Sequence, residues 1–158
     1  MQLPESVWRR RLDSEFRELQ QAGLEFQASP DRTEYVIELR ASGWVFNGSM
    51  ASPQNVHRVR VRLNRSFPYP GGLEVAWLSP IFHPNIRPQD GKVCIHLLNN
   101  WSSLASVAGV ARGLVHLVEH PNTMDALDKK AAEYFAKNFD GTRFVSLKPS
   151  GPRIVSGA

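Results

Sequence analysis

Residues 57–65 read His57-Arg58-Val59-Arg60-Val61-Arg62-Leu63-Asn64-Arg65, and this stretch decides the class of fold. Apolar and basic side chains alternate with a period of two, which is typical of an antiparallel strand with one buried face. Residues 33–41 alternate in the same way, but their outward face carries acidic side chains. Because opposite charges attract across neighbouring strands, we expect these two strands to be paired through a ladder of charges.

Further strands are predicted at residues 24–28 and 73–78, which gives a meander of four strands. Residues 42–56 and 66–72 are rich in Gly, Ser, Asn and Pro and are therefore predicted to be loops.

Helices are predicted before and after the strands. The first begins at Pro4 and ends near Gly23, with one apolar stripe formed by Trp8, Leu12, Phe16 and Leu19. A second helix is expected over residues 103–120, and a third from an N-cap at Thr123 to about residue 138. A run of strands followed by helices predicts an α+β fold.

The composition is that of one globular domain. The chain has 158 residues, 42% of them hydrophobic, and a net charge of +4 spread along its length, which disfavours a nucleic-acid-binding protein. We expect neither a secretory signal nor a membrane-spanning helix. A core over residues 1–141 and an extended tail over residues 142–158 are predicted.

Cys94 is the only cysteine of the chain. A single thiol excludes an intramolecular disulfide and a cysteine-rich zinc cluster, and it suits a reducing compartment such as the cytoplasm. Cys94 lies within residues 81–101, a long segment with little periodicity, and long loops in compact domains are usually functional. The residue alone leaves two roles open, a small buried hydrophobe or a nucleophile.

Residues 81–101 resemble the active-site region of the ubiquitin-conjugating (E2) family. His83-Pro84-Asn85 matches the signature tripeptide of that family, and Cys94 follows Gly91-Lys92-Val93 in a context like that of its thioester cysteine. Trp101, Pro121-Asn122 and Asp125 then occupy positions where the family has a Trp, a Pro-Asn pair and an acidic residue. The resemblance covers roughly residues 4–140 and implies the E2 (UBC-like) fold, with the active-site loop between the sheet and the later helices.

The match has departures. The interval from Asn85 to Cys94 is one residue longer than is usual in the family, so we expect the loop between them to bulge. The tail after residue 141 does not read as the last helix of the family. These features are typical of a divergent member, and a prokaryotic origin is one alternative.

The resemblance implies an enzyme that accepts ubiquitin or a ubiquitin-like modifier as a thioester on Cys94 and transfers it to a lysine amine. It assigns oxyanion stabilisation or loop support to Asn85, orientation and deprotonation of the lysine to Asp125, and support of the loop to His83. The alternative role of Asn85 is that of a turn residue. For Asp125, a charge in the first turn of the third helix is an equally good interpretation.

The resemblance also implies partners. These are an E1-like activating enzyme, which uses the ATP, the modifier itself, and an E3 ligase or a protein acceptor; no cofactor and no metal are expected. The residues expected to bind partners are Arg9, Arg10, Arg11, Phe67, Pro68, Tyr69 and Leu104. A solvated helix face is the simpler role for the three arginines.

Two alternatives remain. One is a non-catalytic E2-like scaffold that binds ubiquitin, although such proteins usually lack the cysteine. The other is a zinc hydrolase, because residues 116–120 match the pattern H-x-x-E-H through His116, Glu119 and His120. That site would need a third protein ligand, and Pro121 ends the helix immediately.

Overall fold

A computed structural model describes residues 1–93 and 106–144 of the chain. Cys94, Trp101 and Leu104 lie outside the described residues, as do the first residues of the predicted second helix and the tail beyond residue 144. The secondary structure elements, in chain order, are α1 (Glu5–Gln21), β1 (Glu25–Ala28), β2 (Glu34–Phe46), β3 (Ala51–Leu63), β4 (Leu73–Trp77), α3 (Val107–Glu119) and α4 (Lys129–Asn138).

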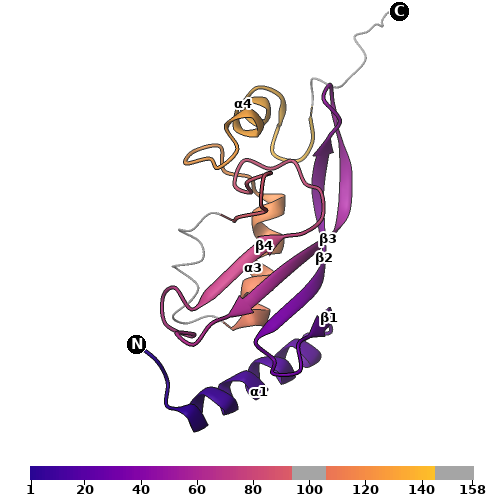
Figure 1. The fold of residues 1–158 in the computed structure, drawn as a ribbon. Coiled ribbons are helices and arrows are strands. Elements are labelled where there is room, and N and C mark those ends of the chain that lie inside the picture. Colours follow the sequence, from indigo (N-terminus) through magenta and orange to yellow (C-terminus); the bar gives the residue numbers. More distant parts are fainter. Residues whose placement is uncertain (94–105, 145–158) are drawn as a thin grey trace, which may run out of the picture.

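The four strands form one antiparallel sheet in the order β1-β2-β3-β4, which confirms the predicted meander and the α+β class. Figure 1 shows α3 behind the sheet, with α1 at one end of the molecule and α4 at the other. Within the described residues, no helix has both the length and the hydropathy that crossing a membrane requires.

The predicted charge ladder is present between β2 and β3. Glu34 pairs with Arg62 in the strand register, and the Arg62 Nε donates to a Glu34 carboxylate oxygen at 3.1 Å. On the opposite face, the apolar side chains of both strands are buried and form the main core with α1 and α3; they are Tyr35, Ile37, Leu39, Val59, Val61 and Leu63.

The prediction of a loop over residues 42–56 is wrong, because β2 and β3 extend through it as a hairpin whose turn is at residues 47–50. The pairing shifts register between Arg40 and Gly43, where an added Cβ on Gly43 would lie 2.8 Å from the His57 ring. The small and polar residues therefore mark a bulge in the strand and not its end. Beyond the bulge, Trp44 and Phe46 pack against a second hydrophobic cluster that includes Phe82, Phe135 and Phe144.

The start predicted for the last helix is also wrong. The helix α4 begins at Lys129, and the Asp128 carboxylate caps it by accepting from the Ala131 backbone N–H at 3.1 Å. Thr123 is not the N-cap, and Asp125 precedes the helix by more than one residue, so it does not lie in the first turn. Residues 121–128 instead form an irregular connection that packs against residues 83–85.

Candidate functional site

The His83 side chain holds the start of the site against the end of α3. It is 2% exposed, its Nδ1 accepts from the Asn85 backbone N–H at 3.0 Å, and its Nε2 lies 2.8 Å from the Leu117 carbonyl oxygen. Since a carbonyl can only accept, the proton is on Nε2 and the ring is neutral. Burial lowers the pKa of His83 to about 4, which keeps this arrangement at neutral pH. His83 therefore joins Asn85 to the end of α3.

The Asn85 side chain joins the loop to the connection between α3 and α4. Its Nδ2 donates to the Asn122 carbonyl at 2.8 Å, and its Oδ1 accepts from the Asn122 backbone N–H at 2.9 Å. The Pro84 carbonyl also accepts from the backbone N–H groups of Leu127 and Asp128, at 2.8 and 3.0 Å. The tripeptide is thus hydrogen-bonded to both ends of residues 122–128. This segment begins at Asn122, one of the residues on which the resemblance rests.

The longer interval between Asn85 and Cys94 is accommodated in a tight turn. Ile86 and Val93 form an antiparallel bridge, and the Arg87 backbone N–H donates to the Lys92 carbonyl at 2.8 Å. Ile86 and Val93 are both buried, so the ends of the turn are fixed in the core. Cys94 follows Val93 directly in the sequence.

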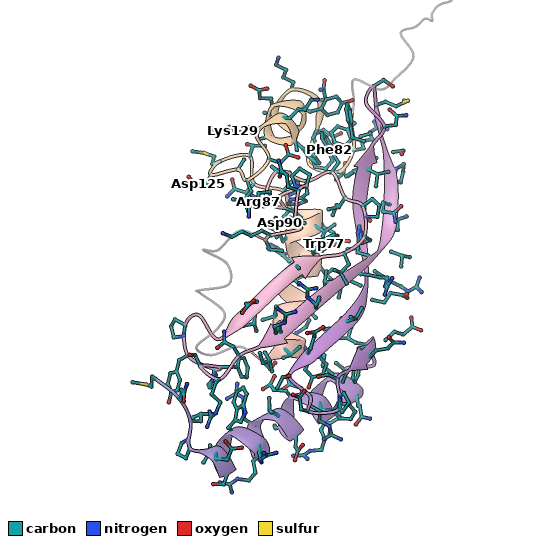
Figure 2. The ribbon with its side chains drawn as sticks, in the orientation of Figure 1. Trp77, Phe82, Arg87, Asp90, Asp125 and Lys129 are labelled. Atoms are coloured by element: carbon teal, nitrogen blue, oxygen red, sulfur yellow. The ribbon has the colours of Figure 1, made fainter. Side chains whose placement is uncertain are left out.

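A groove of about 710 Å³ lies beside the turn. Its apolar lining includes Trp77, Phe82 and Ile86, and charged residues at its border include Arg87, Asp90 and Lys130. In Figure 2, Arg87 and Asp90 lie next to each other between Trp77 and the loop that carries Asp125. Sequence analysis did not assign a role to Arg87 or Asp90, because an arginine and an aspartate three residues apart have no distinctive signature outside a helix.

Asp125 is exposed on the connection between α3 and α4 and has a left-handed backbone conformation with φ of 54°. Aspartate tolerates this conformation better than most residues. The structure therefore places Asp125 on the same connection as the Asn122 that binds Asn85. It does not relate Asp125 to Cys94, which lies outside the described residues.

The expected partner-binding residues differ in their environments. Phe67 has no exposed area and belongs to the core, so the expectation that its side chain contacts a partner is corrected. Pro68 and Tyr69 are half-buried, and Arg10 is exposed. Arg9 forms an ion pair with Glu5 on the surface of α1.

Arg11 has a structural role. Its Nε donates to the buried Glu15 carboxylate at 2.8 Å, and its guanidinium lies 5.0 Å from the centre of the Phe67 ring. Arg11 is therefore paired with Glu15, and Arg9 and Arg10 are the more accessible members of the basic run.

The H-x-x-E-H pattern has structural contacts of its own. A Glu119 carboxylate oxygen accepts from the Ser42 backbone N–H at 2.9 Å. The rings of His116 and His120 stack with their centres 4.0 Å apart. In residues 1–93 and 106–144, no three His, Cys, Asp or Glu side chains are grouped so that they could hold a metal ion. These contacts give no support to the zinc-hydrolase alternative.

Comparison with known proteins agrees with this geometry. The family model described as "Ubiquitin-conjugating enzyme" matches residues 11–145. The chain is 29% identical over 117 residues to Protein PEROXIN-4 of Arabidopsis thaliana, a match that covers 72% of this chain and 73% of that protein. It is 33% identical over 79 residues to Ubiquitin-conjugating enzyme E2 5 of the same plant, covering 49% of this chain and 42% of that protein.

Solved structures give the same result for the fold. S. cerevisiae Ubc12 superposes with a TM-score of 0.63 at 25% identity, covering 82% of this chain and 71% of that one. The E2 domain of a Toxoplasma gondii ubiquitin-conjugating enzyme superposes with a TM-score of 0.64 at 20% identity, covering 82% and 86%. The chain belongs to the ubiquitin-conjugating enzyme family, and the E2 (UBC-like) fold is confirmed.

Proposed function

We propose that this chain carries ubiquitin or a ubiquitin-like modifier as a thioester on Cys94 and transfers it to a lysine amine. The observation that carries the proposal is the hydrogen-bonded unit of His83, Asn85 and Asn122, which lies at the base of the turn leading into Cys94. The chain also keeps Cys94, which non-catalytic E2-like scaffolds usually lack.

The proposed reaction has two transfer steps. In the first, the Cys94 thiolate attacks the thioester carbonyl carbon that an E1-like enzyme presents, a new C–S bond forms, and the activating enzyme's thiolate leaves. In the second, a lysine amine attacks the same carbonyl carbon, a C–N bond forms, the Cys94 thiolate leaves, and the amine loses a proton. Lysine has an ordinary pKa of about 10.4 and is mostly protonated at pH 7, so the second step needs help with deprotonation.

Asn85 is proposed to support the loop and to assist at the oxyanion. Its bonds to both backbone groups of Asn122 favour the supporting role. The side-chain amide has two N–H donors, so binding the Asn122 carbonyl does not use all of its donor capacity. Asp125, exposed and on the connection that Asn85 holds, is proposed to orient the lysine and accept its proton.

Partners follow from this assignment. An E1-like activating enzyme is proposed to dock near the exposed Arg9 and Arg10, and an E3 ligase or the acceptor protein itself near Pro68 and Tyr69 on the loop after β3 and Leu104 before α3. A cytoplasmic location remains a prediction.

A charging assay tests the proposal. Purified protein, activating enzyme, ATP and modifier should give a new band on a non-reducing gel that thiol reductant removes and that Cys94→Ala lacks. Asn85→Ala should still become charged but should discharge to free lysine about 100-fold more slowly, since one oxyanion donor contributes about 3 kcal/mol. If wild type binds the modifier but never forms the band with a competent activating enzyme, the non-catalytic scaffold is correct.

A further inference from the structure

The turn that precedes Cys94 is closed by an unusually complete ion pair. Arg87 Nε donates to Asp90 Oδ1 at 2.9 Å, and Arg87 Nη2 donates to Asp90 Oδ2 at 2.6 Å. Asp90 Oδ1 also accepts from the Lys92 backbone N–H at 3.1 Å. Two parallel bonds fix the relative orientation of guanidinium and carboxylate, which a single contact does not. The side chains therefore set the shape of residues 87–92.

The far side of the same turn rests on the end of β4. The Trp77 backbone N–H donates to the Gly91 carbonyl at 2.8 Å, and Ala76 forms a bridge with Lys92. Gly91 has a positive φ of 74°, and a Cβ added there would lie 2.1 Å from the Trp77 carbonyl oxygen. Only glycine fits this close approach, so the turn cannot slide along the strand.

The ion pair and the contacts with β4 both constrain the backbone next to Val93. It is fully buried and bridges to Ile86, one residue after Asn85, while Lys92 is held by Asp90 and by β4. The path of the chain up to Val93 is thus fixed from two directions, by the hydrogen-bonded His83–Asn85 segment and by the Arg87–Asp90 ion pair. The ion pair contacts no reacting atom, and both of its side chains are partly exposed.

We propose that Arg87 and Asp90 are positioning residues for transfer of the modifier, because they fix the backbone at Lys92 and Val93, directly before Cys94 in the sequence. This inference rests on the proposed thioester function and extends it to two residues within the turn that is one residue longer than expected. Surface ion pairs contribute little to stability, so the expected effect is on the reaction and not on folding. A displacement of the reacting group by about 1 Å can cost as much as 100-fold in rate.

Discharge of a preformed thioester to free lysine is the measurement of choice, because it isolates the transfer step. Asp90→Ala and Arg87→Ala are each expected to lower the maximal discharge rate about tenfold, with little change in the lysine concentration at half saturation. The exchanged pair, Arg87→Asp with Asp90→Arg, restores the ion pair but not the bond that Asp90 accepts from the Lys92 N–H, so its rate should lie between those of Asp90→Ala and wild type. A role in stability alone would not give this split between rate and saturation.

A matched control is available within the chain. Asp140 and Arg143 are also three residues apart, and the Asp140 carboxylate accepts from the backbone N–H groups of Thr142 and Arg143 within its own turn. This turn follows α4 and packs through Phe139 and Phe144. Asp140→Ala should leave discharge unchanged. Equal rates for wild type and Asp90→Ala, or loss of rate in Asp140→Ala as large as in Asp90→Ala, would overturn the proposal.

Alkylation of Cys94 by iodoacetamide separates this inference from the proposed function. The thiolate displaces iodide, so the reaction needs no activating enzyme and reports only on the thiol and its surroundings. Asp90→Ala should change the alkylation rate at least about twofold relative to Asp140→Ala, and the exchanged pair should restore it in part. If wild type never becomes charged but Asp90→Ala still changes the alkylation rate, the proposed thioester function is wrong. Arg87 and Asp90 would then still position the segment that precedes Cys94. An unchanged alkylation rate would overturn the positioning role.

Discussion

The two ends of α3 are held in chemically different ways. At its N-terminus, Glu15 from α1 accepts from the Val107 backbone N–H at 2.6 Å, and the Ser106 hydroxyl donates to Glu18 at 2.6 Å. At its C-terminus, the neutral imidazole of His83 donates to the Leu117 carbonyl. Carboxylates suit the positive end of the helix dipole. A cation would suit the negative end equally well, but full burial of His83 removes that option because an unpaired buried charge is too costly.

The difference has a consequence for function. The carboxylate end faces α1, whose exposed arginines are proposed to meet the activating enzyme. The imidazole end belongs to the segment that leads to Cys94 and is bonded to Asn85. We therefore expect substitutions at the two ends to differ: those at His83 should affect both stability and transfer, and those at Glu15 mainly stability.

The largest effect is expected for His83→Ala. The substitution leaves the Leu117 carbonyl and the Asn85 N–H without the partner each has in His83, and it opens a cavity in a fully buried site. Together these should lower the free energy of unfolding by about 4 kcal/mol, measured by urea denaturation. His116→Ala, an exposed histidine on the same helix, is the control and should change it by less than about 0.5 kcal/mol. Comparable losses in the two variants would remove the distinction between buried and exposed imidazoles.

A smaller effect on the free energy of unfolding is expected when the pH is lowered, because the contribution of His83 depends on its protonation state. The folded side chain takes up a proton only below its pKa of about 4, whereas the unfolded one does so below 6.5. The stability that His83 contributes is therefore complete above pH 6.5 and is lost as the pH falls towards 4. Between those limits the loss should approach about 3 kcal/mol.

The comparison of wild type with His83→Gln isolates this contribution, because every other titrating group is common to both proteins. Urea denaturation at several pH values between 7 and 4 should show a steeper fall for wild type. Parallel curves for the two proteins would mean that His83 titrates alike in the folded and unfolded states.

The sequence predicted the sheet much better than the contacts of the site. Alternation in residues 33–41 and 57–65 identified both central strands and their charge ladder, because period two is a local property of a half-buried strand. The hairpin beyond Gly43 was missed because its stability comes from packing of Trp44 against Phe144 and of Phe46 against Tyr134, residues that are far away in the sequence. No local pattern carries that information.

For the site too, the sequence predicted some features and missed others. The resemblance identified His83 and Asn85, and their hydrogen bonds then followed from the fold. The start of α4 was misplaced because Thr123 and Asp128 are both good N-caps, and the choice between them is made by the Pro84 carbonyl, which binds the N–H groups of Leu127 and Asp128. Arg87 and Asp90 carried no signal, since an ion pair across an irregular turn depends on the backbone path that it stabilises.

The smallest effect is expected at the other end of α3, for Glu15→Ala. The buried Val107 N–H would lose its acceptor and Arg11 its carboxylate, which should lower the free energy of unfolding by about 2 kcal/mol. Glu15→Gln keeps an acceptor for Val107 and should cost less.

Burial raises the pKa of Glu15, so the folded state takes up a proton there more readily than the unfolded state. The contribution of Glu15 to stability therefore rises as the pH falls, opposite in sign to that of His83. Urea denaturation of wild type and Glu15→Gln at pH 7 and pH 4.5 measures this difference, and a contribution with the same sign as that of His83 would contradict the contrast between the two ends. Discharge of the thioester by Glu15→Gln should stay at the wild-type rate, because this end of the helix does not touch the His83–Asn85 segment.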